Sequence, residues 1–267
     1  MKRLGPQNKR AVMGKNRFQR AIALAAILGL AAAPGAASDQ LRQFLISRRC
    51  VGCDLSATVL AGANLEDADL TGANLAGANL RQARLPRAQM AQTDLRQANL
   101  SQAVISQADL SEADLAGANL RGATLTGSRL VGVNATAINL QNAEARESNW
   151  SGSDLSDSRL DGASFAQAGL AQANLSRVTL TDGRLYRANL IGARLDGVDF
   201  TGADLRETLI RDASVDGANF TNADLYGANL VRTDLSTAQF CNTRMAKGEI
   251  NNDHCAELGV SPDRPAS

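Results

Sequence analysis

The sequence predicts an all-β solenoid, a chain wound into a stack of short and similar coils, and three observations lead to this prediction. Large apolar residues recur at every fifth position from Leu55 to Phe240, without an insertion or a frame shift. Small residues, mostly Ala, stand two places before them. Aromatic residues make up only 3% of the chain, which is too few for a core built on large rings. A period of five fits neither an α-helix nor a β-strand, whose periods are about 3.6 and 2.

The repeat has three positions with a marked preference. The large apolar series has 38 positions, of which 27 are Leu. The small series contains 24 Ala, and Asn or Asp directly precedes the large residue in 22 cases. We expect the large and the small residue to point inwards and the other three to face water. Each buried Leu then contributes roughly 1.5–3 kcal/mol, and neighbouring coils must stack because one coil cannot bury its own apolar side.

This pattern resembles that of the pentapeptide-repeat family, whose unit is a small residue, Asn or Asp, Leu or Phe, and two variable residues. The segments Ala63-Asn64-Leu65 and Ala78-Asn79-Leu80 show the unit almost undiluted. The resemblance implies a right-handed quadrilateral β-helix with four repeats per coil. Residues 53–240 would then form about nine coils, stacked at a strand-like spacing of about 4.8 Å.

One layer departs from the pattern, because Ala135 and Ala145 are undersized and Trp150 is oversized. Together with Leu140 these residues would belong to one coil. The favoured interpretation is compensation of volume inside a close-packed interior. The alternative is that Trp150 is expelled and marks a bulge or a contact point.

The amino terminus predicts an export signal over residues 1–38. A stretch with seven basic residues and no acidic ones precedes an apolar run from Ala21 to Ala33, and small residues follow. Thirteen residues are fewer than the roughly 20 that a membrane-spanning helix needs. Cleavage after Ala37 or after Ser38 fits equally well, and translation could start at Met1 or Met13. An uncleaved membrane tether is the alternative; with cleavage we expect a periplasmic or secreted protein that has no membrane association.

Charge argues against nucleic acid as a partner. Removal of the seven basic residues of the signal from the 28 in the chain leaves 21 against 27 acidic residues, a net charge of −6. The mature chain therefore has no basic stripe that could contact phosphates.

The two ends of a solenoid expose apolar faces and open edges, and therefore need covers. Residues 39–52 form the expected N-terminal cap, in which Leu41, Phe44 and Leu45 stand at helical spacing. Residues 241–267 form the expected C-terminal cap and tail, and we expect the tail around Pro262 and Pro265 to be frayed. Because no apolar helix is expected to cover this end, end-to-end pairing of two copies is an alternative way to cover it.

The four cysteines form one pair at each end, Cys50 with Cys53 and Cys241 with Cys255. A single four-thiolate metal site is excluded if the pairs lie tens of Å apart. Haem attachment would need His where Asp54 stands. The runs around the cysteines resemble those of exported family members, and an even number of cysteines in an oxidising compartment is typical of structural bridges. We therefore expect two terminal disulfides.

Nothing in the sequence predicts catalysis. The single histidine, His254, is expected in an exposed tail with no role, and the alternative is a base or a ligand. Without a second histidine no Ser-His-Asp arrangement exists elsewhere, and we find neither a phosphate loop nor a metal-ligand spacing. We expect no enzymatic activity, no cofactor and no metal.

One wall of the solenoid carries residue types that are frequent at protein interfaces. Residues 20 apart should stack, which places Arg146, Ala166, Tyr186, Arg206 and Tyr226 in one column, with Arg184 and Arg187 beside it. Tyr and Arg are enriched at interfaces, so this face could bind an unidentified protein; an ordinary solvated wall is the alternative. The functional expectation is a non-catalytic, exported scaffold or interaction module of the bacterial envelope. The resemblance also implies an alternative, a cytosolic protein that imitates DNA and binds topoisomerases.

Overall fold

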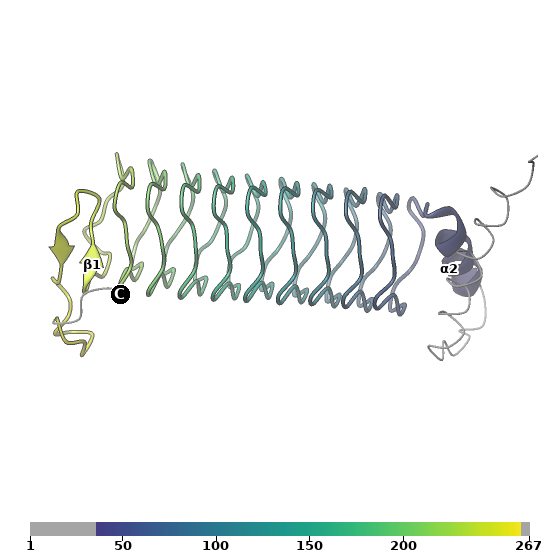
Figure 1. Ribbon diagram of the computed structural model, residues 1–267, viewed down its shortest axis with the longest axis horizontal. Coiled ribbons are helices and arrows are strands. Elements are labelled where there is room, and N and C mark those ends of the chain that lie inside the picture. The colour runs from purple at the N-terminus through teal and green to yellow at the C-terminus, as the bar shows by residue number, and fades with distance from the viewer. Residues whose placement is uncertain (1–35, 263–267) are drawn as a thin grey trace, which may run out of the picture. The chain divides into compact units, whose positions relative to one another are not determined.

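A computed structural model describes residues 36–262 of the chain (Figure 1). The chain divides into two units between Asp39 and Gln40, and the coils belong to the second. The expected signal, residues 1–38, lies outside the described residues except for the start of helix α2, Ala36–Ser47. Within residues 36–262 no helix combines the length and the apolar character needed to cross a bilayer.

The second unit is the expected right-handed β-helix. Parallel bridges join residues that are 20 apart, from the pair Arg49–Asp69 to the pair Asp224–Arg244. The bridging positions recur every five residues, so each coil of 20 residues has four of them. This agrees with the expected four-sided coil and with about nine coils over residues 53–240. The strands longer than one residue in the described part are β1, Thr243–Arg244, and β2, Ile250–Asn251.

The backbone of each five-residue unit is tied to the coils on both sides of it. In a representative unit, the Leu80 N–H donates to the Asn99 carbonyl (2.7 Å) and the Arg84 N–H donates to a carbonyl of the preceding coil (2.9 Å). The corner is a β-turn, in which the Ala83 N–H donates to the Leu80 carbonyl (2.9 Å). The third residue of this turn, Gln82, has φ 57°. Glycine or an L-residue in the left-handed region therefore stands at nearly every corner, at a cost of roughly 1–2 kcal/mol for each L-residue.

The Asn and Asp residues of the repeat bind the remaining backbone donor. In the unit that begins at Asp109, the carboxylate accepts a hydrogen bond from the N–H of Ser111, two residues later (2.9 Å). All 22 Asn and Asp residues at this position make the same contact. The preference therefore satisfies the one N–H per unit that the ladder and the turn leave free.

The core is a filled tube of Leu and Ala. Of the 38 large apolar positions, 36 are buried, and the exceptions are Leu230 and Leu235. Toward the C-terminal end the rings of Phe200, Phe220 and Phe240 stack on one another at centroid distances of 5.2 and 5.5 Å. The expectation that the leucines line the interior is confirmed.

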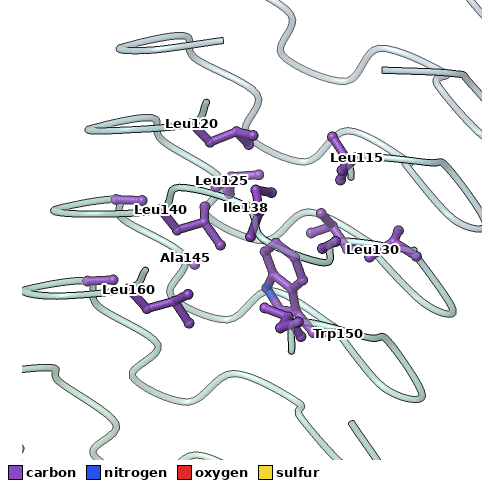
Figure 2. Packing of buried hydrophobic residues seen from close by; sticks show 14 of the residues in the cluster. Leu115, Leu120, Leu125, Leu130, Ile138, Leu140, Ala145, Trp150 and Leu160 are labelled. Atoms are coloured by element: carbon purple, nitrogen blue, oxygen red, sulfur yellow. The ribbon is translucent and has the colours of Figure 1, made fainter. Parts of the chain in front are cut away.

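Trp150 lies inside the tube, which confirms compensation and contradicts the bulge. Its side chain is 0% exposed, and the bridging ladder passes it without interruption. The indole N–H donates to the Ser148 hydroxyl (2.7 Å), which donates to the Ala145 carbonyl (2.5 Å). The ring lies 5.9 Å from that of Phe165, one coil beyond Ala145 in the same column. The indole therefore extends toward the column in which Ala145 leaves space, as Figure 2 shows.

Helix α2 forms the N-terminal cap only in part as expected. Phe44 is fully buried and Leu41 packs partly against the core. Leu45, which was also expected in the lid, is 37% exposed, because it falls on the outer side of the helix. The Gln40 side chain accepts a hydrogen bond from the N–H of Asp54 (3.1 Å) and so covers one open edge of the first coil.

The C-terminal cap is more ordered than a frayed tail. Strands β1 and β2 pair antiparallel, and the Asn242 N–H donates to the Asn252 side chain (2.7 Å). His254 is half-buried instead of exposed. Its backbone N–H donates to the Phe240 carbonyl (3.0 Å) and its Nδ1 accepts from the Phe240 N–H (3.2 Å). The sequence reasoning missed this because the segment lies outside the repeat. The part of the expected tail beyond residue 262 lies outside the described residues.

Candidate protein-binding face

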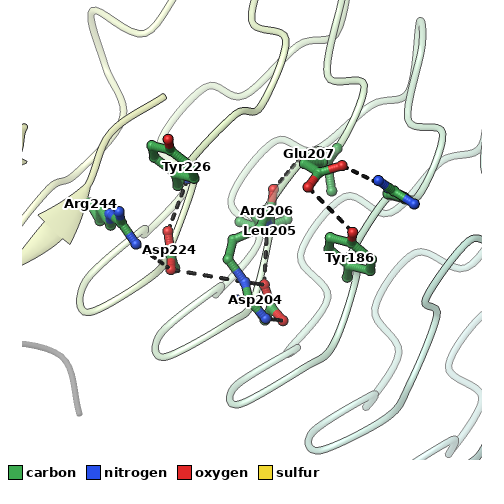
Figure 3. Close-up of polar contacts among 10 residues, drawn as sticks. Tyr186, Asp204, Leu205, Arg206, Glu207, Asp224, Tyr226 and Arg244 are labelled. Atoms are coloured by element: carbon green, nitrogen blue, oxygen red, sulfur yellow. Dashed lines mark hydrogen bonds and ion pairs between the residues drawn. The ribbon is translucent and has the colours of Figure 1, made fainter. Parts of the chain in front are cut away.

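The structure brings together most of the residues expected to form the binding face. We call the wall that contains residues 184–187, 204–207 and 224–226 the tyrosine face (Figure 3). Parallel bridges join Arg184 to Asp204 and Asp204 to Asp224, and so align these three segments side by side. The side chains at the following corners, which include both tyrosines, therefore stand in one column along the wall.

Tyr186 lies at the centre of a contact group on this face. Its hydroxyl donates to Glu207 Oε1 (3.3 Å), and Arg187 Nε donates to Glu207 Oε2 (2.7 Å). The guanidinium groups of Arg187 and Arg206 lie 5.0 and 5.7 Å from the centroid of the Tyr186 ring. At these distances both cations favour the negative ring face.

Tyr226 has a similar environment two coils farther along the wall. The Arg244 guanidinium lies 4.2 Å from the centroid of the Tyr226 ring and 3.5 Å from Asp224 Oδ2. Arg206 makes two hydrogen bonds to Asp204, both 2.7 Å, from Nε and from a terminal nitrogen. Arg244 was not expected at the face because it lies beyond Phe240, where the five-residue repeat ends. The signal that could have found it is its spacing of 20 from Asp224.

Arg146 and Arg184 form a separate group around Glu144, farther toward the N-terminus. Arg184 reaches Glu144 across two coils (3.2 Å), and Arg146 Nε lies 3.2 Å from the same carboxylate. Arg146 also donates to the Ser164 hydroxyl (3.2 Å). Within residues 36–262 no side-chain hydrogen bond or ion pair joins this group to Tyr186. Of the six expected residues, Arg146 and Arg184 therefore extend the face and do not belong to its centre.

The charged groups of the tyrosine face hold one another in the ionised form. The hydrogen bond from Arg187 lowers the pKa of Glu207 below its usual 4.5. Burial acts to raise the pKa of Asp204, but hydrogen bonds from Arg206 outweigh it and bring the pKa below the usual 3.8. The same contacts raise the pKa of Arg187 and Arg206. Glu207, Asp204, Arg187 and Arg206 are therefore all charged near neutral pH.

The neighbouring wall adds exposed apolar side chains toward the C-terminal end. Leu209 is 38% and Val231 53% exposed, and Tyr226 itself is 47% exposed. Val131 and Ile191, whose spacing from Val231 is a multiple of 20, are half-buried. Aromatic, cationic and apolar groups thus lie together at this end.

The cysteines lie at the two ends, as expected, and form disulfides between Cys50 and Cys53 and between Cys241 and Cys255. Cys241 and Cys255 are almost completely buried, so this bond holds the C-terminal cap against the last coil. Over residues 36–262 no cluster of three or more His, Cys, Asp or Glu side chains has an arrangement that could hold a metal ion.

A comparison with protein families identifies the five-residue repeat. The family described as "Pentapeptide repeats" matches in eight copies, over residues 49–86, 88–127, 103–142, 138–177, 168–212 and 203–240. A comparison with curated protein sequences found no match.

Several solved structures are similar to the chain. HetL, a pentapeptide repeat protein involved in heterocyst differentiation regulation from the cyanobacterium Nostoc, shares 32% identity over 79% of this chain and 97% of its own, with a TM-score of 0.36. A pentapeptide repeat protein from the Arabidopsis thaliana thylakoid lumen shares 27% identity over 48% of this chain and 75% of its own (TM-score 0.30). QnrB1, a plasmid-mediated fluoroquinolone resistance protein, shares 19% identity over 78% and 98% (TM-score 0.36).

The family match runs through almost every residue from 49 to 240, and it uses the same five-residue unit that forms the walls of the coils. This protein therefore belongs to the pentapeptide repeat family.

Proposed function

We propose that this protein is a non-catalytic, exported scaffold that binds a protein partner through the tyrosine face. The observation that carries the proposal is the environment of the two tyrosines. Tyr186 and Tyr226 are the only tyrosines of the chain, both stand on this wall, and each has an arginine over its ring. Aromatic side chains that neighbouring cations hold in place lose little conformational freedom on binding, which favours their use as anchors.

The proposed export is supported by the cysteines and by the amino-terminal sequence. Disulfides persist in oxidising compartments and are rare in the cytosol, and the residues that precede α2 have the basic and apolar regions of an export signal. The absence of catalysis is proposed from the sequence, whose only histidine, in the C-terminal cap, accepts a hydrogen bond from the backbone N–H of Phe240 at the end of the repeat.

The ordinary solvated wall is the competing interpretation, because every arginine of the tyrosine face already has an acidic partner. The DNA-imitating alternative has less support, since 20 arginines remain after the signal and many lie next to the acidic residues. Cell fractionation distinguishes the compartments: we expect a shortened chain in the periplasm, and a full-length cytosolic chain would favour the alternative.

Affinity capture with a matched control tests the binding face. The triple substitution Tyr186→Ser, Arg206→Ser and Tyr226→Ser removes the two rings and one cation, and we expect it to abolish capture of a periplasmic partner while the circular dichroism spectrum is retained. Arg96→Ser is the control, because Arg96 makes the same pair of hydrogen bonds to Asp94 as Arg206 makes to Asp204. If the triple variant captures the partner as well as the wild type does, the tyrosine face is not the binding site.

A further inference from the structure

The last coil is open on the side formed by residues 230–239. Leu230 and Leu235 are the two inward leucines that are not buried. The bridging ladder also has a gap here: Arg194 pairs with Ser214, but no bridge joins Ser214 to Asp234. We call residues 230–239 the open side.

The open side has unused backbone donors. In the regular coils each inward residue donates its N–H to a carbonyl of the next coil, and Leu225 still donates to Arg244 (2.7 Å). The N–H groups of Leu230 and Leu235 have no partner among residues 36–262, and neither do those of Arg232 and Thr237.

The C-terminal cap satisfies the next side of the coil and not this one. The Phe240 N–H donates to His254 Nδ1, and the Asn242 N–H donates to the Asn252 side chain. The cap therefore ends where the open side begins. Unpaired backbone of this kind is a template for an added strand.

Acidic side chains border the open side. Asp234 and Asp216 have no ion-pair partner in the described part of the chain. Arg194, which pairs with Ser214 in the ladder, instead has its Nε 3.9 Å from Asp196 Oδ2. The Thr237 hydroxyl donates to Asp216 (3.1 Å), which places that carboxylate directly at the open side. Val231, 53% exposed, adds an apolar contact.

We infer that the open side binds an extended peptide segment with basic side chains, which adds one further parallel strand to the ladder. The backbone of the peptide would donate to the carbonyls of Ala228 and Thr233 and accept from the N–H groups of Leu230 and Leu235. An inward apolar side chain of the peptide would cover these two leucines, and its basic side chains would meet Asp216 and Asp234. Backbone pairing supplies affinity and the pockets supply specificity in this mode of recognition. The site is separate from the tyrosine face, so each proposal can fail without the other.

The test uses the full mature chain and the fluorescein-labelled peptide Ala-Arg-Leu-Lys-Gly-Ala-Arg-Leu-Lys-Gly, which follows the repeat and carries basic residues at outward positions. We expect saturable binding by fluorescence anisotropy. We also expect hydrogen exchange of the amides of Leu230, Arg232, Leu235 and Thr237 to be fast in the free protein and at least tenfold slower with peptide.

Two controls separate backbone pairing and charge from nonspecific attraction. Methylation of both peptide arginine amide nitrogens removes the donors and should weaken binding at least tenfold. Asp216→Lys with Asp234→Lys should weaken it to a similar extent, whereas Asp109→Lys with Asp154→Lys should not. The second pair is matched to Asp234, since each carboxylate accepts from the N–H of a serine two residues later.

Any of four results would overturn the inference. Two concern the peptide: no binding at millimolar concentration, or equal binding of the methylated form. The others are equal weakening of peptide binding by the 216/234 and 109/154 double substitutions, and protection of the four amides from exchange in the free protein. If their protection instead rises with protein concentration together with a dimeric mass in light scattering, a second copy is the occupant and the peptide proposal is wrong.

Discussion

Trp150 and Ala145 should be energetically coupled, because the indole extends toward space that a leucine at position 145 would fill. Trp150→Leu restores the commonest residue of the repeat and removes about 60 Å³, which at ~24 cal/mol per Å³ of cavity destabilises the protein by about 1.5 kcal/mol. The loss of the indole donor to the Ser148 hydroxyl adds about 1 kcal/mol.

Ala145→Leu alone overfills the layer and should cost about 1–3 kcal/mol. In the double variant the added leucine occupies the volume that the indole vacates. Its free energy of unfolding should therefore exceed the value expected from adding the two single effects by about 2 kcal/mol, within the range observed for residues in contact.

The assay is urea unfolding followed by circular dichroism, since the two variants that carry Trp150→Leu lack the only tryptophan. Leu80→Val, at a buried position more than three coils away, serves as a control, and it should be additive with Ala145→Leu if the effect is local. Strict additivity of the 145 and 150 substitutions would refute the compensation of volume described here.

Three further predictions concern the caps, the side-chain turns and acid stability. Replacing Cys241 and Cys255 by Ser should lower the free energy of unfolding by about 3 kcal/mol, because this bond closes a loop with a separation of 14 residues. Replacing Cys50 and Cys53 should lower it by only about 2 kcal/mol, because their separation is 3 residues. Equal losses of stability in denaturant unfolding would contradict this dependence on loop length. Asn119→Ala should cost about 1 kcal/mol because the Arg121 N–H loses its acceptor (3.1 Å), and Asn119→Asp should restore most of it in thermal melts; an unchanged melting temperature for the alanine variant would show that water replaces the bond freely. The pKa of Asp204 is below 3.8 in the folded protein, so the stability that its carboxylate contributes is present above about pH 4 and is lost as the pH falls through the lowered pKa. In the Asp204→Asn variant the melting temperature should therefore fall less steeply between pH 5 and 2. An unchanged slope would argue against the role of Arg206.

The fold could be predicted in detail because one spacing encodes it. The inward position of the leucines and the place of Trp150 both follow from counting in fives, since every layer has the same environment. The four-sided coil came from the family resemblance, and bridges between residues 20 apart agree with it. The physical reason for Asn and Asp could not be read from the pattern. It depends on the backbone N–H two residues later, which lacks a backbone partner only because of the turn conformation at each corner.

The ends and the open side were much less predictable. Leu230 and Leu235 have the same sequence context as the buried leucines, and they differ only because no coil follows them. Leu45 and His254 lie outside the repeat, so their burial depends on how single segments fold back on the coils. On the tyrosine face the column was foreseeable from the spacing of 20, but the choice of partner for each arginine depends on side-chain conformations.

The 20-residue register also determines how such a chain can change length. Insertion or deletion of 20 residues would shift the C-terminal cap by about 4.8 Å along the axis and leave its orientation to every wall unchanged. A gain of five residues would instead swing the cap by a quarter turn and carry the open side to a different wall. Duplication during evolution can therefore adjust reach and direction independently, and relatives that differ by whole coils should present the same surfaces at a different separation.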